Sequence, residues 1–222
     1  MAKIRNAKPK SSSGGYFRLT GNKQVADLLT KAQSTVITNG TELEKMIAKR
    51  ANCITNLDEF MLNVNSGIIT EGTYLCTKKV AKKSSYSLYK KEPDFLIFIL
   101  TKTGKTCLII ELKDGDAFDT KKSSSEYESL VLYKNHIGSL IEFKTNYKIC
   151  AFNQLSKEKI KQGFKNEFTE DQIMTGKEFC DILSIDYEEI VNKRKEDAED
   201  NFEYFIQEMT SIINTLENKK TD

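Results

Sequence analysis

Two short apolar runs separated by a polar turn lie near the middle of the chain. Residues 95–100 and 107–110 are rich in β-branched and aromatic side chains, and Thr103 with Gly104 forms a turn signal between them. This pattern predicts a β-hairpin. Because both runs are apolar at consecutive positions, we expect the hairpin to be covered on its two faces, inside a larger sheet.

Helical periodicity precedes the hairpin. Apolar residues at helical spacing follow Asn39, Gly40 and Thr41, with Thr41 as the expected N-cap. A first helix is therefore predicted from about residue 42 to about residue 64. Its apolar stripe consists of Leu43, Met46, Ile47, Ile54 and Leu57.

A second set of elements follows the hairpin. The pattern predicts a polar loop over 114–125, a helix over 126–143 and a strand over 147–152. The rest of the chain is mostly helical, over 157–164, over 176–180 leading into 187–192, and from about 195 to 218. This succession predicts an α/β (α+β) fold, in which a central mixed β-sheet is flanked by helices and followed by a helical C-terminal part.

The length of 222 residues is most simply that of one domain. A basic start with Lys3, Arg5, Lys8 and Lys10 runs into serines and glycines at 11–15, so residues 1–22 are expected to form a flexible basic N-terminal arm. Residues 23–222 are expected to form a single domain, with a core over about 40–155 and a helical region over about 156–222.

Composition argues against several classes of protein. The longest apolar runs are far shorter than the roughly eighteen residues of a membrane span, and no signal peptide opens the chain. We therefore expect a soluble, cytoplasmic protein without a membrane partner. The five cysteines, at positions 53, 76, 107, 150 and 180, form no CxxC pair, which argues against a zinc site.

Charged side chains lie at the open end of the predicted hairpin. With the loop centred on the turn signal, Asp94 would lie opposite Lys113, and Glu111 opposite Leu96. All four side chains would then point to one face. Because isolated charges inside a sheet are costly to desolvate, something must offset them. Either Asp94 and Lys113 form an internal ion pair, or a Mg²⁺ ion is held by Asp94, Glu111 and the Leu112 carbonyl.

The spacing of these residues carries a resemblance. Pro93 and Asp94 are followed, after sixteen residues, by Glu111, Leu112 and Lys113. This pattern resembles the signature of the PD-(D/E)xK nuclease superfamily, which includes most type II restriction endonucleases. The chain is most similar to that group, and the resemblance implies a restriction-endonuclease-like core.

The resemblance also implies an activity. The chain would be a type II restriction enzyme, a Mg²⁺-dependent, sequence-specific double-stranded DNA endonuclease that leaves 5′-phosphate and 3′-hydroxyl ends. Asp94, Glu111 and Lys113 would be catalytic, the metal would be held by Asp94, Glu111 and Leu112, and the enzyme would be a homodimer. Two alternatives stay open: a structure-selective nuclease, such as a Holliday junction resolvase or repair nuclease, and a non-catalytic DNA-binding protein on the same fold.

A further acid is implied on the first helix. Glu44 follows Gly40 by four residues, as in the equivalent helix of related DNA-cleaving enzymes, and would be a metal-binding residue. Thr41 and Glu44 also have the spacing of a capping box, in which the glutamate only returns to the helix start. Glu42 and Glu59 are lesser candidates for the same role.

Lysines cluster directly before the first acid. Six lysines lie between residues 77 and 91 and could contact DNA phosphates. The alternative is a solvated lysine-rich loop. The loop after Lys113 contributes two more lysines that could pass close to DNA. The DNA-binding candidates are Lys78, Lys79, Lys82, Lys83, Tyr86, Lys90, Lys121 and Lys122.

The last helix carries an apolar stripe that is broader than the others. Its members recur at helical spacing and would either pack into the core or form the seam of a homodimer. They are Phe202, Phe205, Ile206, Met209, Ile212, Ile213 and Leu216.

Overall fold

The structure of the protein is a computed structural model, and it describes residues 1–8, 14–89, 91–115 and 123–218. Internal contacts divide the chain into two compact units. We call residues 46–187 the sheet unit, and residues 1–45 together with 188–222 the helical unit. The sequence predicts one domain from residue 23 onward, whereas the contacts group both ends of the chain into a unit of their own.

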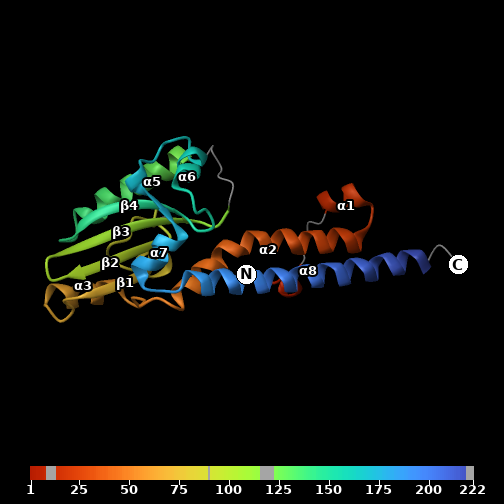
Figure 1. Ribbon diagram of the computed structural model, residues 1–222, viewed down its shortest axis with the longest axis horizontal. Coiled ribbons are helices and arrows are strands. Elements are labelled where there is room, and N and C mark those ends of the chain that lie inside the picture. Colours follow the sequence, from red (N-terminus) through yellow and green to blue (C-terminus); the bar gives the residue numbers. More distant parts are fainter. Residues whose placement is uncertain (9–13, 90, 116–122, 219–222) are drawn as a thin grey trace. The chain divides into compact units, whose positions relative to one another are not determined.

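The sheet unit is built on five strands in the order β1-β2-β3-β4-β5 (Figure 1). β1 and β2 are antiparallel, as are β2 and β3, whereas β3, β4 and β5 run parallel to one another. The predicted α/β class, with a central mixed sheet flanked by helices, is therefore confirmed. The strands are β1 (Gly72–Thr77), β2 (Phe95–Thr101), β3 (Gly104–Lys113), β4 (Lys144–Ala151) and β5 (Ile173–Thr175).

The predicted hairpin is confirmed as β2 and β3, but its register differs from the prediction by two residues. The ladder ends with Phe95 opposite Ile110, and the turn consists of residues 102 and 103. One further step along this register places Asp94 opposite Glu111 and not opposite Lys113. Because a shift of two residues preserves the alternation of side chains, these three charged side chains still share one face.

One face of the sheet is covered by α3 (Leu57–Asn65) and α5 (Ser123–Gly138). Phe98 of β2 packs against Phe60 of α3, with ring centroids 5.2 Å apart. Tyr133 of α5 is fully buried in the same cluster. This is also the face to which Asp94 points, since it lies two residues before the buried Leu96 of that cluster.

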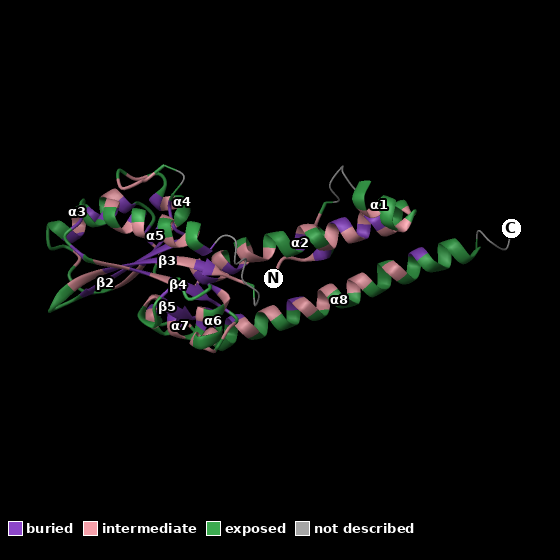
Figure 2. Ribbon diagram, turned by 90° about the horizontal axis from the view of Figure 1, so that it is seen from above, coloured by how far each residue is buried: buried purple, intermediate pink, exposed green. Residues whose placement is uncertain are grey.

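The other face of the sheet is covered by α7 (Gly176–Leu183), and Figure 2 shows buried strands between helices on both sides. Phe179 of α7 lies against Phe95, with ring centroids 5.8 Å apart. Residues 95–98 are each at most 1% exposed, as their unbroken apolar run predicts. At Gly176 a side chain would collide with the carbonyl of Phe152, so glycine is needed for α7 to start against the end of β4.

The first predicted helix has the wrong bounds. α2 spans Lys23–Ala48, and the next helix, α3, begins at Leu57. Thr41 therefore lies inside α2 and is not an N-cap. The threonines of α2 fit a helix because the hydroxyls of Thr30 and Thr35 donate to the carbonyls four residues earlier, at 2.7 and 2.8 Å.

The start of α3 has its own signal. Asn56 is the N-cap, and its side chain accepts hydrogen bonds from the amides of Asp58 and Glu59 at 3.1 and 3.3 Å. Before Asn56, the backbone of Cys53 forms an isolated β-bridge with Leu75 of β1. This bridge attaches the segment between α2 and α3 to the sheet. This connection splits the predicted helix over 42–64 into the end of α2 and α3.

The remaining elements follow the predicted order with shifted bounds. α5 ends at Gly138, before the predicted residue 143, and β4 starts at Lys144. A continuous α8 (Tyr187–Asn218) replaces the two predicted helices in that region. The short elements α4 and η2, and the strands β1 and β5, were not predicted. The other bounds are α4 (Lys78–Ala81), α6 (Lys157–Gly163) and η2 (Glu170–Gln172).

The helical unit consists of α1 (Gly14–Thr20), η1 (Ile4–Asn6) and most of α2 and α8. Its buried apolar cluster is small and joins Ile4, Leu28 and Ile212. Despite their lengths, neither α2 nor α8 is apolar enough to cross a membrane, and the same holds for every other described helix.

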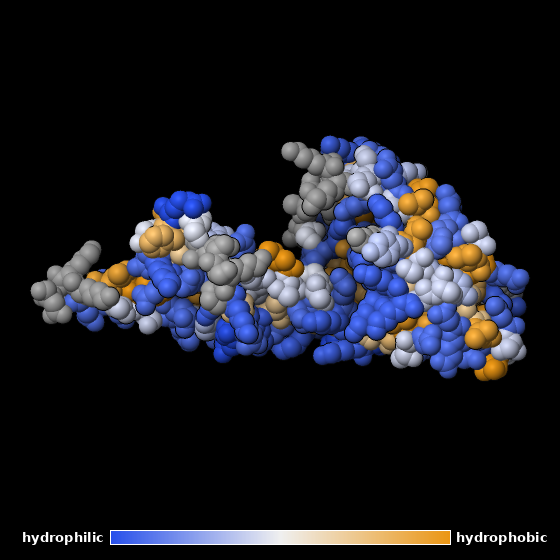
Figure 3. Space-filling view, turned by 180° about the vertical axis from the view of Figure 1, so that it is seen from behind, coloured by the Kyte–Doolittle hydropathy of each residue, from blue (hydrophilic) through white to orange (hydrophobic). Residues whose placement is uncertain are grey.

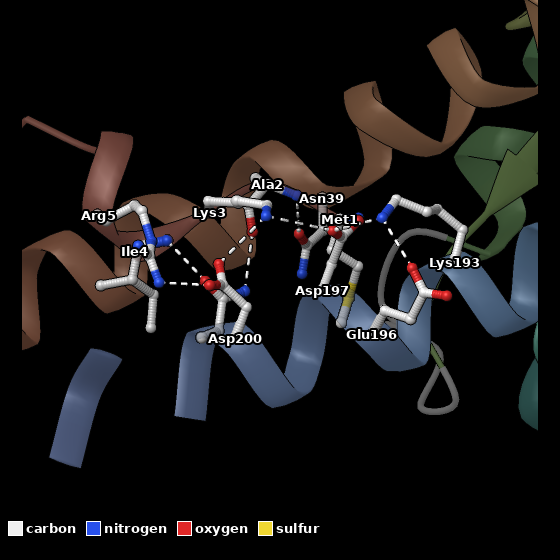
Figure 4. A network of polar contacts seen from close by, with 11 residues as sticks. Met1, Ala2, Lys3, Ile4, Arg5, Asn39, Lys193, Glu196, Asp197 and Asp200 are labelled. Carbon is white, nitrogen blue, oxygen red and sulfur yellow. Dashed lines mark hydrogen bonds and ion pairs between the residues drawn. The ribbon is translucent and has the colours of Figure 1, made fainter. Parts of the chain in front are cut away.

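Residues 1–5 are held on α8 by a network of polar contacts (Figure 4). Lys3 Nζ lies 3.2 Å from Asp200 and 3.7 Å from Asp197, Arg5 pairs with Asp200, and the amino group of Met1 pairs with Asp197. Burial would raise the pKa of Asp197, but the Met1 amino group, Lys193 and Lys3 outweigh burial and lower it. The first residues of the predicted flexible arm are thus anchored by α8.

The apolar stripe of α8 is only partly covered. Phe205, Met209 and Ile212 pack in the cluster with α2. Phe202 is 68% exposed and Ile206 is 47% exposed, as is Ile213. Figure 3 shows separate hydrophobic patches on the otherwise mostly hydrophilic surface of the helical unit. The structure therefore divides the stripe into a packed side and an exposed side.

Candidate active site

Two acids lie side by side at the end of the β2–β3 hairpin. Asp94 directly precedes β2, and Glu111 is opposite it near the end of β3. Asp94 is 9% exposed, and 22% of the Glu111 side chain is exposed. The sequence analysis predicts that the two acids share one face but are not directly opposite each other, and the observed register brings them closer than predicted.

Asp94 is fixed by the strand it faces. Its Oδ2 accepts a hydrogen bond from the Leu112 amide at 2.9 Å. The Lys113 carbonyl, by contrast, accepts from the Phe152 amide and so points toward β4. Because neighbouring residues of a strand direct their backbone groups to opposite edges, the Leu112 carbonyl points toward the Asp94 side. Asp94, Glu111 and the Leu112 carbonyl thus present oxygen atoms to one place.

Lys113 contacts different partners from the one predicted. Its Nζ lies 3.0 Å from Glu111 Oε1 and 2.6 Å from Oε1 of Glu126, a residue of α5. Asp94 pairs instead with Lys78, whose Nζ is 3.2 Å from Asp94 Oδ1. In place of the internal Asp94–Lys113 pair, which was one of the two alternatives, the structure has three ion pairs: Asp94 with Lys78, Lys113 with Glu111, and Lys113 with Glu126.

The electrostatics of the acid pair are unfavourable without added positive charge. Burial raises the pKa of Glu111, and the neighbouring Asp94 raises it further, against the opposing effect of Lys113. Burial would lower the pKa of Lys113, but Glu111 and Glu126 outweigh burial and raise it. Lys113 is therefore an ammonium at neutral pH, and the two acids repel each other.

A pocket of about 190 Å³ opens beside the acid pair. Glu111 and Lys78 line it from the sheet side, and Glu126 and Tyr133 line it from α5. Glu92 also lines it and is only 4% exposed. The sequence analysis did not single out Glu92 or Glu126, because neither lies within the spaced motif around the hairpin.

The donors at this site suit a hard divalent cation. Carboxylate and carbonyl oxygens are the ligands that Mg²⁺ prefers, and one or two carboxylates commonly suffice when waters complete the shell. A cation would also relieve the repulsion that raises the pKa of Glu111. Within the described residues, no three or more His, Cys, Asp or Glu side chains gather as a metal site. Glu44 lies within α2, in the helical unit, and its metal-binding role stays a prediction.

The chain has a close counterpart along its whole length. It is 47% identical to the type II restriction enzyme HhaII of Haemophilus parahaemolyticus over 225 aligned residues, which cover 99% of each protein. The chain belongs to the type II restriction enzyme family. Members of this family are site-specific deoxyribonucleases. No family model matches the sequence, and no solved structure matches it.

The residues of this restriction enzyme that are predicted to contact DNA differ from one another in their surroundings. All four of the predicted lysines that the structure describes, Lys78, Lys79, Lys82 and Lys83, are exposed, and Lys78, at the start of α4, also pairs with Asp94. The Tyr86 side chain is half-buried and packs against the core, so its ring is less accessible than predicted. The predicted contacts of Lys90, Lys121 and Lys122 lie outside the described residues.

The repulsion between the acids leads to a stability prediction. Without divalent cations, Glu111→Gln should raise the midpoint of thermal unfolding by on the order of 2–4 °C, which corresponds to about 1 kcal/mol. A raised folded-state pKa means that the ionised Glu111 is penalised at neutral pH, and that the penalty disappears as the pH falls through this pKa. The gain should therefore shrink in acid.

Calorimetry in EDTA, at about pH 7.5 and about pH 5, measures this difference. The matched control is Glu142→Gln, which removes the charge of an exposed glutamate in the same unit and should leave the midpoint unchanged. A Glu111→Gln variant that is less stable than the wild type at neutral pH would contradict the repulsion.

Proposed function

We propose that the protein is a Mg²⁺-dependent, sequence-specific endonuclease of the PD-(D/E)xK superfamily, which cuts double-stranded DNA to leave 5′-phosphate and 3′-hydroxyl ends. One observation carries the proposal: Asp94 and Glu111 lie opposite each other with Lys113 beside them, in a chain 47% identical to a type II restriction enzyme. Asp94, Glu111 and Lys113 are the proposed catalytic residues.

The oxygens of Asp94, Glu111 and the Leu112 carbonyl would hold the cation. When bound, the cation stabilises negative charge on the phosphate and favours ionisation of a bound water. The attacking water would give up a proton to the surrounding water while its oxygen forms a bond to phosphorus, and the bond from phosphorus to the 3′ oxygen would break. The 3′ oxygen leaves with a proton taken from water, and the new 5′ end keeps the phosphate.

Lys113 acts in this scheme as a positive charge and not as a base. Its raised pKa keeps it protonated near neutral pH, so it can donate a hydrogen bond to the attacking water and to the charge that grows on the phosphate. Preorganised donors of this kind contribute about 100- to 1000-fold to turnover. The position of Lys113, two residues after Glu111 on one face, fits it to this role.

The exposed lysines next to Asp94 are proposed to contact DNA phosphates. Lys79, Lys82 and Lys83 lie on and just after α4, whose first residue, Lys78, already reaches Asp94. The segment is attached to α3, because Asp58 accepts hydrogen bonds from Ser85. A fixed group of positive charges beside the acids would direct the DNA backbone toward them, with an affinity that falls as salt rises.

A homodimer is proposed through the exposed side of α8. Phe202, Ile206, Ile213 and Leu216 are exposed and lie on one side of the helix, spaced by four, seven and three residues, which is compatible with the repeat of a coiled-coil seam. Residues 210–216 carry no charge, whereas 199–208 carry only acids. Antiparallel pairing of two copies would place the acidic half against the neutral half and avoid like-charge repulsion. Such two-fold symmetry suits the reading of two DNA half-sites.

The nuclease proposal predicts the loss of one activity at three positions. Asp94→Ala, Glu111→Ala and Lys113→Ala should each lower the rate of plasmid cleavage in Mg²⁺ by about 100- to 1000-fold or more, because each removes charge stabilisation at the reacting phosphate. Fixed fragments in a digest of phage DNA, with ends sequenced, test sequence specificity and end chemistry.

Two controls accompany these variants. Glu128→Ala and Lys102→Ala each remove an exposed charge of the same sign in the same unit and should cleave as the wild type does. Full cleavage by Asp94→Ala or Lys113→Ala would reject the assignment of the site. Cleavage of branched DNA alone would favour a structure-selective nuclease instead.

The dimer proposal predicts a difference between two charge insertions on one helix. Ile206→Glu should convert the protein to monomers at micromolar concentration, because it buries a carboxylate in the seam. Ser211→Glu adds the same charge at an exposed position away from the stripe and should leave the dimer intact. Light scattering after size exclusion measures the mass, and a monomeric wild type would contradict the proposal.

A further inference from the structure

Glu126 is an acid that the mechanism above does not use. It lies in the first turn of α5, and its Oε1 is 2.6 Å from Lys113 Nζ. The other partner, Glu111, is more distant, at 3.0 Å. Only 20% of the Glu126 side chain is exposed, and it lines the same pocket as Glu111. The ammonium thus has two carboxylate partners, of which only one belongs to the acid pair.

These two partners differ once a cation is bound. Glu111 would then share its charge with the cation, which weakens its hold on Lys113. The lysine side chain has four flexible methylene groups, so its ammonium adopts several positions unless a fixed acceptor holds it by a hydrogen bond. Glu126 is the acceptor that stays, because it comes from a helix and is not part of the proposed ligand set.

α5 provides a rigid support for Glu126. Leu130 and Tyr133, on the following turns, are 3% and 0% exposed and anchor the helix on the sheet. An acid in the first turn of a helix is also favoured by the helix dipole. The dipole accounts for an acid at this position, but it does not account for a short contact across to β3.

We propose that Glu126 is a positioning residue, which holds the Lys113 ammonium toward the attacking water while Asp94 and Glu111 hold the cation. This inference rests on the proposed nuclease function. The inference gives α5 a role in the reaction. The sequence motif of Asp94, Glu111 and Lys113 lies on the hairpin alone and does not include this helix.

The decisive variant is Glu126→Gln, which keeps the size of the side chain and removes its charge. Single-turnover cleavage should slow by about 10- to 100-fold, as is typical when a residue that orients an active-site group is changed. DNA affinity measured in Ca²⁺, Mn²⁺ affinity measured by calorimetry, and the unfolding midpoint should all stay as in the wild type. The matched control is Glu128→Gln, an exposed acid on the same helix, which should change none of these.

A measurement that does not depend on DNA cleavage tests the positioning role of Glu126 separately from the proposed nuclease function. Acetylation of Lys113 by acetic anhydride in the presence of Ca²⁺, followed by mass spectrometry, should be several-fold faster in Glu126→Gln than in the wild type or in Glu128→Gln. An unchanged acetylation rate would overturn the positioning role. Lost Mn²⁺ affinity in Glu126→Gln would overturn it as well, because Glu126 would then be a metal ligand. If the wild type cuts no DNA, the nuclease function fails, and the acetylation rate still decides whether Glu126 holds Lys113.

Discussion

The repulsion between Asp94 and Glu111 is the constraint on which the rest of the site depends. The Leu112 amide fixes one carboxylate, and the register of the hairpin places the other opposite it. Because both are largely buried, positive charge has to be supplied nearby. Lys78 and Lys113 supply it from two sides, and a divalent cation would supply more. A sheet end arranged in this way is costly for folding, and it suits the metal and phosphate binding that we propose for it.

The sequence predicts those features of the site that depend on residues close together in the chain. The two apolar runs and the turn between them fix β2 and β3, and the alternation of strand residues fixes the common face of Asp94, Glu111 and Lys113. The pairing partners were wrong because the turn is residues 102 and 103. The turn lies one residue earlier than the Thr103-Gly104 signal, and the pattern of apolar residues does not distinguish these two registers, because both keep the same side chains on each face.

The contacts that the sequence does not predict are those between distant segments. Glu126 reaches Lys113 only because α5 crosses the face of the sheet, and Lys78 reaches Asp94 only because β1 ends beside the start of β2. The strands β1 and β5 are short, so their patterns are weak. At the other extreme, α2 continues through Gly40 and Thr41, which resemble a helix start, and its following residues Leu43 and Ile47 are fully buried. Local signals are overridden in both cases by the packing of the whole unit.

We propose that oxygens of Asp94, Glu111 and Leu112 converge on one divalent cation. The most direct test is anomalous diffraction from crystals of the protein grown with Mn²⁺. The account predicts a peak between the two carboxylates, at ligand distance from one oxygen of each and from the Leu112 carbonyl. A peak held by other residues, or none at a concentration that supports cleavage, would contradict it.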